Sequence, residues 1–305
     1  MISRVLAFVA ATQMGCASAQ AADPRGFDQG RVMKQQPSVL PRRARVEVIN
    51  RILKDRLDRV LPKLMRQAGI DMWLVINREY AEDPVYLTLV PEPVFAARRT
   101  TILLFHDRGP ERGLERVTVS RYPIKDFYAS VWQGGNLDEQ WRKLAELIAA
   151  RKPSKIGINT SRDWPLADGL TASLKERLLA TLPSDLQAKV VSAEQLVVRW
   201  LETRTELERA VYPQAVGLAR WVIAEAFSER VITPGATTTD DVAWYIRQRF
   251  HDLDLRPWFQ PYVNVQRASQ KNSPDKTFYG ESGVVIQRGD VLHTDVGICY
   301  LRMCT

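Results

Sequence analysis

The sequence predicts an α/β fold in two successive parts, a three-layer α/β domain followed by an α+β region. Short apolar runs typical of buried strands alternate with amphipathic helical patterns up to about residue 196. Beyond that point the pattern is mostly helical, and strand-like segments return after Trp258. At 305 residues the chain exceeds one ordinary core, and its 45% hydrophobic and 26% charged residues exclude a disordered or fibrous class. Two domains are therefore expected, over residues 43–196 and 197–305.

Residues 1–22 have the pattern of a secretory signal peptide. Arg4 gives a positive start, residues 5–11 are apolar, and small residues up to Ala21 offer cleavage sites. Lipid attachment at Cys16 is a second interpretation, although the residues before it fit that motif poorly, and a frayed apolar terminus is a third. We expect an exported protein, periplasmic or secreted, in which residues 23–42 form an extended arm. No run is long enough for an internal membrane span.

A long helical pattern opens the first domain. Apolar residues recur at three- and four-residue steps from Val46 to Leu64. Pro62 should break or kink this helix near Leu61, because proline lacks the amide hydrogen that a helix interior uses. Gly69 is a suitable C-cap.

The rest of the first domain alternates strands with helices. Strands are predicted at 72–76, 100–105, 117–119, 156–158 and 190–191. Helices are predicted at 137–150, with Asn136 as N-cap, and at 166–179, with Pro165 in the first turn. The polar residues 78–83 follow a strand end, where sites often form, but we interpret them as a solvated loop.

The second domain begins with a mostly helical stretch, 194–231, which Pro213 is expected to interrupt. Residues 232–235 form a turn. Thr238 and Asp241 then start a helix that runs to about Phe250. Strands are predicted at 262–265, 283–286 and 291–300.

The net charge of +8 and the pI near 9.5 would suit a nucleic-acid-binding protein, but the distribution of the charges along the sequence argues against this function. Arginines alternate with acidic residues along the helical stretches 45–51 and 54–59, which is typical of a solvated helix face. We therefore expect no nucleic-acid binding.

The three cysteines do not form a disulfide framework. Cys16 is expected to be removed when the signal peptide is cleaved. Cys299 and Cys304 are five positions apart, so on one strand they would lie on opposite faces. We predict that they do not pair with each other.

The strand predicted at 291–295 carries a carboxylate in an apolar context. Alternation places Val291, His293 and Asp295 on one face. A carboxylate inside an apolar strand is costly unless it is paired or bound to a cation, and divalent metals take oxygen ligands. Asp295 is thus a candidate metal ligand; the alternative is a partly exposed, hydrogen-bonded carboxylate.

The C-terminal segment resembles the motif that opens the metal site of the creatinase/prolidase-like "pita-bread" metallopeptidases. The matching residues are Gly289, Asp290, Asp295, Gly297 and Tyr300. The turn 233–235 and the helical stretch 202–227 resemble the same family, and residues 69–75 and 78–80 resemble the N-terminal domain of Xaa-Pro aminopeptidases and prolidases. The resemblance implies a creatinase-type N-terminal α/β domain followed by an incomplete pita-bread α+β domain.

For the site, the resemblance implies two divalent ions (Mn, Zn or Co) held by two Asp, one His and two Glu around a bridging hydroxide. Only the first Asp maps onto this chain, at Asp295, and the second would follow Thr305. We therefore expect the 305-residue chain to hold no stably bound metal and to be inactive. The substrate-contacting His that such peptidases carry is absent between Asp252 and Leu292. His293 shares the face of Asp295 and is one candidate to replace that His, but we interpret it as a support for the ligands or as a hydrogen-bonded strand histidine.

The implied reaction is removal of the N-terminal residue from a short peptide, including Xaa-Pro peptides, by a homodimer. Two alternatives stay open. One is a creatinase-like amidinohydrolase on the same fold, and the other is a non-catalytic fragment that dimerises or binds peptides.

Overall fold

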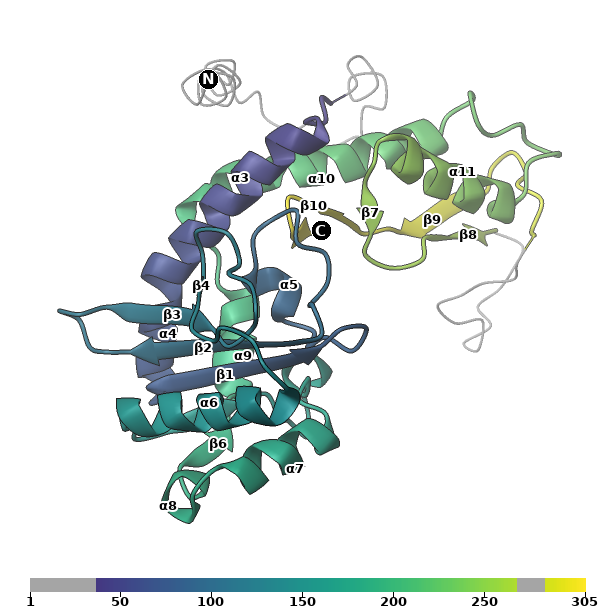
Figure 1. The fold of residues 1–305 in the computed structure, drawn as a ribbon. Helices are drawn as coiled ribbons and strands as arrows, with labels where there is room; N and C mark the ends of the chain where they lie inside the picture. The colour runs from purple at the N-terminus through teal and green to yellow at the C-terminus, as the bar shows by residue number, and fades with distance from the viewer. Residues whose placement is uncertain (1–36, 268–282) are drawn as a thin grey trace. The chain divides into compact units, whose positions relative to one another are not determined.

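A six-stranded mixed sheet lies at the centre of the N-terminal half of the structure (Figure 1). The computed structural model describes residues 37–267 and 283–305, so the predicted signal peptide lies outside the described residues. In sheet order, the strands are β4 (Ala129–Ser130), β3 (Leu114–Thr118), β2 (Thr100–Asp107), β1 (Met72–Arg78), β5 (Ile156–Ile158) and β6 (Val190–Ser192). β1 runs antiparallel to β2 and parallel to β5. The five strands predicted for this part of the chain are confirmed.

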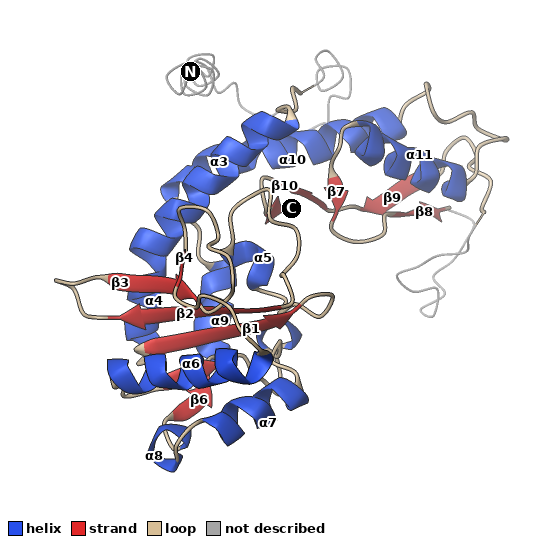
Figure 2. Cartoon of the chain, viewed as in Figure 1, coloured by secondary structure: helices blue, strands red, loops and turns tan. Residues whose placement is uncertain are grey.

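Helices cover both faces of this sheet, as the predicted three-layer arrangement requires (Figure 2). Alternate residues of β1 separate two apolar cores, with Trp73 and Val75 in one and Met72 and Leu74 in the other. The Met72 side is covered by α6 (Leu137–Arg151), α7 (Ala172–Thr181) and α8 (Ser184–Gln187). The Trp73 side is covered by α4 (Leu61–Ala68), α5 (Tyr86–Leu89) and α9 (Glu194–Glu202).

The first helical segment contains a π-helical turn directly before Pro62. α3 (Arg42–Asp55) leads into η1 (Arg56–Val60), and α4 follows with Pro62 in its first turn. Pro62 has no amide hydrogen to donate, and the wider turn accommodates the missing bond without ending the helix. Gly69 adopts φ 64° and caps α4 as predicted.

A second core forms between two helices and the strands that follow them. α10 (Glu206–Ala226) and α11 (Thr239–Asp252) pack together, and β8 (Tyr262–Gln266) pairs with β9 (Val291–Asp295). A separate three-stranded sheet contains β7 (Arg256–Pro257), β10 (Ile298–Tyr300) and β11 (Met303–Cys304). The Thr238–Asp241 capping box at the start of α11 is confirmed. Over the residues described, no helix combines the length and the apolar character needed to cross a bilayer.

The prediction that Pro213 interrupts a helix is wrong. Pro213 lies inside α10, and the chain breaks earlier, at Thr203, where α9 ends. Thr205 and Glu208 then form the capping box that starts α10. Proline removes one backbone hydrogen bond, but Ala215, Leu218 and the later apolar residues of α10 are buried in the second core. Burial of that face keeps the helix continuous through the proline.

The helix predicted over residues 166–179 is divided by a tertiary contact. A 3-10 turn, η2 (Pro165–Ala167), is separated from α7 by residues 168–171. The Leu170 amide donates to the Asn159 carbonyl at 2.9 Å. A Cβ at Gly169 would lie 2.3 Å from Cγ of Asp83, so only glycine fits there. These long-range contacts hold the segment out of the helix.

The strand predicted over residues 283–286 is reduced to a single bridge between Val285 and Thr238. Ile286 donates its amide to the Thr237 carbonyl at 2.9 Å, and Gly235 donates to the Ile286 carbonyl at 2.7 Å. The segment therefore forms hydrogen bonds with the turn before α11 and does not form a strand.

The loop after β1 is not solvated throughout, contrary to the prediction. Asp83 is only 2% exposed. Its carboxylate accepts hydrogen bonds from the Val85 amide at 3.0 Å and from Nδ2 of Asn159 at 2.8 Å. Burial raises the pKa of Asp83 above its ordinary value.

Substituting Gly217 in the middle of α10 with alanine should stabilise the protein. A Cβ added there meets no heavy atom within 4 Å. Alanine loses less backbone entropy than glycine on helix formation, so Gly217→Ala should raise the free energy of unfolding by about 0.5–1 kcal/mol. Urea denaturation measures the change, and a fall in stability would contradict it.

Candidate functional site

The strand that carries Asp295 presents the two faces that the sequence predicts. Val291, His293 and Asp295 are exposed on one face of β9. Leu292 and Val296 point the other way and pack against the second core. The alternation of β9 is therefore confirmed, and the Asp295 carboxylate is open to solvent.

The neighbouring strand extends this face with polar side chains. Tyr262 lies directly opposite Asp295, and Asn264 lies opposite His293. Opposed residues of an antiparallel pair share a face. The rings of Tyr262 and His293 are 6.0 Å apart, and Oγ1 of Thr294 donates to the Tyr262 carbonyl at 2.7 Å, which ties the strands together. Tyr262, Asn264, His293 and Asp295 thus form one polar surface, the Asp295 face.

The predicted turn before β9 is held by an ion pair. Gly289 adopts φ 90°, which favours glycine. The Asp290 carboxylate accepts hydrogen bonds from the Gln287 amide at 2.7 Å and from Nε of Arg267 at 2.8 Å. The bond from Arg267 keeps the pKa of Asp290 below its usual range. This arrangement fixes the end of β8 against the start of β9, so Asp290 has a structural role here.

The side chains on the Asp295 face do not by themselves fit a two-metal centre. Within residues 37–267 and 283–305, no three His, Cys, Asp or Glu side chains are grouped so that they could hold a metal ion. Each ion of such a centre needs several protein ligands, and His293 and Asp295 are two residues of a single strand. Metal ligation by Asp295 and support by His293 stay predictions, and we derive no catalytic step through a metal.

The prediction that Cys299 and Cys304 do not pair is wrong. They form a disulfide with a Cα–Cα distance of 4.0 Å. Both residues of the turn between β10 and β11, Leu301 and Arg302, have positive φ, so the chain reverses and places Cys299 directly opposite Cys304. The alternation argument failed because it assumed one continuous strand.

The tip of the same hairpin makes contacts that the sequence did not reveal. Nη2 of Arg302 lies 2.9 Å from Oε1 of Glu92, and Nη1 donates to the Val90 carbonyl at 2.7 Å. Burial lowers the pKa of Arg302, and Glu92 opposes that shift. The hairpin that follows Asp295 is thus fixed by a disulfide and by a half-buried ion pair.

Removing the disulfide should destabilise the protein modestly. Cys299 and Cys304 close a loop of only a few residues, for which chain entropy gives a loss of roughly 2 kcal/mol in the free energy of unfolding. A Cys299→Ser, Cys304→Ser variant and the reduced wild type should show the same loss in urea denaturation. Equal stability of the oxidised and reduced proteins, with thiol titration confirming each state, would contradict this expectation.

The comparisons with known proteins identify the fold. No protein-family model matches the sequence, and no curated protein matches it. The structure is similar to the X-Pro aminopeptidase from Thermotoga maritima MSB8, with a TM-score of 0.54 and 19% identity over 80% of this chain and 62% of that one. It is also similar to a dipeptidase from Pyrococcus horikoshii OT3, with a TM-score of 0.52 and 17% identity over 85% and 63% of the two chains. For aminopeptidase P from E. coli with the inhibitor Pro-Leu, the TM-score is 0.52 and the identity 12% over 87% and 60%.

These similarities confirm the predicted fold class, a creatinase-type α/β domain followed by an α+β region of the pita-bread fold. The chain spans about three fifths of the length of each of these solved structures, as the coverages of 62%, 63% and 60% show.

Proposed function

We propose that this chain contributes to a hydrolase that removes the N-terminal residue from short peptides, Xaa-Pro peptides included. One observation carries the proposal: the chain has the fold of solved X-Pro aminopeptidases and dipeptidases, and within that fold Asp295 projects from the exposed face of β9. The polar neighbours Tyr262 and His293 give this face groups that can hydrogen-bond a peptide.

In this proposal Asp295 is one ligand of a two-cation centre of Mn, Zn or Co. When bound, such ions activate a water molecule and polarise the scissile carbonyl. Among the described residues, Asp295 is the ligand and the imidazole of His293 on the same face supports it; no group of three or more potential ligand side chains is found there. The role of the described chain is to hold this carboxylate in place, through the β8–β9 ladder and the Arg267–Asp290 pair.

The test is an activity assay of the natural gene product supplied with Mn, Zn or Co in turn. Release of the N-terminal residue from Xaa-Pro dipeptides supports the proposal. Turnover of creatine with no peptide hydrolysis would replace it with the amidinohydrolase alternative, and a folded protein that turns over neither substrate would overturn it.

A matched pair of variants assigns the role of Asp295. Asp295→Asn should lower kcat/KM for Xaa-Pro dipeptides by at least about 100-fold, because the neutral amide is a poor ligand for a hard cation. Glu111→Gln removes one exposed carboxylate in the loop before β3 and should leave kcat/KM unchanged. Equal activity of the two variants would remove Asp295 from the site.

We also propose that the protein is exported. The Cys299–Cys304 disulfide supports this, because disulfides persist in oxidising compartments and are rare in the cytosol. Fractionation of the native host, with N-terminal sequencing of the mature protein, tests the proposal; an intact Met1 in a cytosolic fraction would overturn it. Homodimerisation stays a prediction that sedimentation analysis can test.

A further inference from the structure

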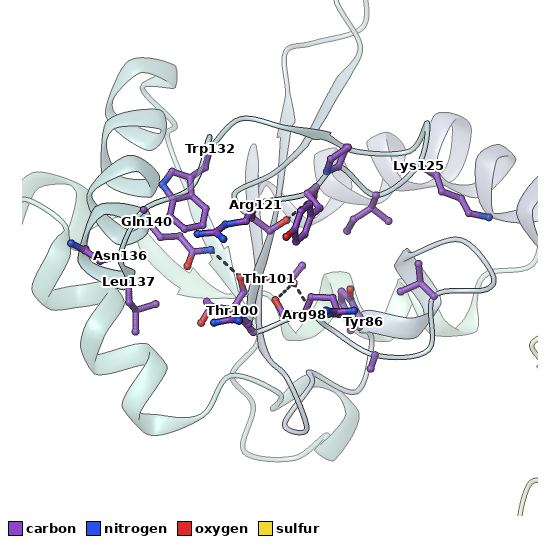
Figure 3. A pocket seen from close by; sticks show the side chains of 18 residues that line it. Tyr86, Arg98, Thr100, Thr101, Arg121, Lys125, Trp132, Asn136, Leu137 and Gln140 are labelled. Carbon is purple, nitrogen blue, oxygen red and sulfur yellow. Dashed lines mark hydrogen bonds between the residues drawn. The ribbon is translucent and has the colours of Figure 1, made fainter.

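A cavity in the N-terminal half of the molecule has a strongly basic lining. It measures about 640 Å³, within the range of small-molecule sites, and lies between the start of β2, the segment 120–125 and the start of α6 (Figure 3). Four of its lining residues are cationic: Arg98, Arg99, Arg121 and Lys125. No Asp or Glu is among the lining residues.

The three arginines of this cavity have no ion-pair partner among the described residues, in contrast to the buried and half-buried arginines elsewhere in the structure. Elsewhere Arg56, Arg151 and Arg302 each meet a carboxylate within 3.0 Å. Within the described residues, the guanidinium groups of Arg98, Arg99 and Arg121 have no carboxylate partner and no side-chain hydrogen bond. Cations gathered in one concave surface create a positive potential that attracts an anion.

Acidic side chains around the cavity are hydrogen-bonded to other groups. Glu79 accepts a hydrogen bond from the Arg99 amide at 3.0 Å, and Glu82 accepts one from the Ala97 amide at 2.9 Å. Glu139 of α6 caps its own helix by accepting a hydrogen bond from the Asn136 amide at 3.0 Å. Asp138 pairs with Arg177 on α7. None of these four carboxylates forms an ion pair with Arg98, Arg99 or Arg121 within the described residues.

The floor of the cavity is rigid and buried. Nε2 of Gln140, whose side chain is 2% exposed, donates to the Thr100 carbonyl at 2.9 Å and to the Val119 carbonyl at 2.5 Å. Oγ1 of Thr101 accepts from the Arg98 amide at 3.2 Å and donates to the Arg98 carbonyl at 3.1 Å. The backbone beneath Arg98 is thus fixed before any ligand arrives, which lowers the entropy lost on binding.

The lining also contains aromatic side chains. Trp132 follows β4 and Arg121 precedes it, while Tyr86 and Arg98 come from two other segments (Figure 3). Tyr122 is 61% exposed and lies at the rim. Planar guanidinium groups bind phosphate oxygens in a bidentate manner, while lysine contributes a point charge.

We propose that this cavity binds a small organic molecule that carries a phosphate group. Arg98, Arg99 and Arg121 hold the phosphate, and Tyr122 and Trp132, which are accessible, contact the organic part. The site lies on the sheet domain and contains no residue of the Asp295 face, so it adds a second, separate ligand to the proposed peptidase function.

Isothermal titration with AMP, ribose 5-phosphate and adenosine tests this proposal without a hydrolysis assay. At least one of the two phosphate esters should bind with a Kd between about 10 μM and 1 mM, and neutral adenosine should not bind. Arg98→Gln with Arg121→Gln should weaken that binding at least about 10-fold, because each guanidinium contributes charge-assisted hydrogen bonds.

The control variant, Arg43→Gln with Arg51→Gln, removes the same net charge from two exposed positions of α3 and should leave the affinity unchanged. Both variants should keep the wild-type unfolding temperature, since none of the four side chains is buried. Absence of saturable binding for both esters, or equal weakening in the two double variants, would overturn the proposal. Neither outcome depends on peptidase activity.

Discussion

Glu208→Ala is expected to lower the free energy of unfolding by about 3–5 kcal/mol, because it leaves the buried Arg56 guanidinium without its counter-ion. The side chains of Arg56 and Glu208 are 9% and 8% exposed, and Nη1 of Arg56 lies 2.9 Å from Oε2 of Glu208. Arg56 also donates to the Thr203 carbonyl at 2.6 Å and stacks 4.2 Å from the Trp200 ring. Burial lowers the pKa of Arg56, and Glu208 opposes that shift.

Two further variants separate the ion pair from the helix cap. Oε2 of Glu208 also accepts a hydrogen bond from the Thr205 amide at 2.7 Å, as part of the capping box of α10. Thr205→Ala removes the reciprocal hydroxyl bond and should lower the free energy of unfolding by about 1 kcal/mol. Replacing both charged residues with apolar ones, as in Arg56→Met with Glu208→Leu, should destabilise less than Glu208→Ala alone. Guanidinium denaturation measures all three, and a loss below about 1 kcal/mol for Glu208→Ala would contradict the expectation.

Trp73→Ala should also destabilise the protein by about 3–5 kcal/mol, through the cavity it leaves in the sheet core. Trp73 is 0% exposed and stacks on Phe105 with ring centroids 5.2 Å apart. Its Nε1 donates to Oδ1 of Asn159 at 2.7 Å, and Asn159 in turn donates to Asp83. The substitution thus also removes the hydrogen-bond donor that Asn159 uses in the core.

Trp73→Phe isolates the polar part of this effect. Phenylalanine keeps most of the packing but has no N–H to donate to Asn159. The variant should therefore lose only about 1–3 kcal/mol in the free energy of unfolding, which is the cost of leaving Oδ1 of Asn159 without a hydrogen bond. Trp164→Ala is the control at an exposed tryptophan. Because Trp164 is 53% exposed, its substitution should change the free energy of unfolding by less than about 0.5 kcal/mol. Comparable losses at Trp73 and Trp164 would show that the sheet core is not packed as described.

The local features that the sequence predicted depend on neighbouring residues in the chain. The strand at β1, the Asn136 cap of α6 and the Thr238 cap of α11 all follow from short patterns. The alternating faces of β9 follow in the same way, because side chains of an extended strand point to opposite sides.

Several predictions failed because a residue has a partner distant in the sequence, whereas the Cys299–Cys304 prediction failed on a local turn between residues five positions apart. Asp83 is buried because Asn159, 76 positions away, binds its carboxylate. Pro213 stays within α10 because the helix buries its apolar residues in the second core. No short pattern contains either contact.

The sequence alone determined the fold class, most of the helices and strands, and Asp295 as the candidate ligand. Tertiary structure decided the Cys299–Cys304 pairing, the buried Arg56–Glu208 pair and the gathering of Arg98 and Arg121 around one cavity. The physical reason is that hydrophobic periodicity, helix capping and turn formation depend on a few neighbouring residues. The burial of an ion pair and the gathering of like charges depend on which distant residues the folded chain brings together.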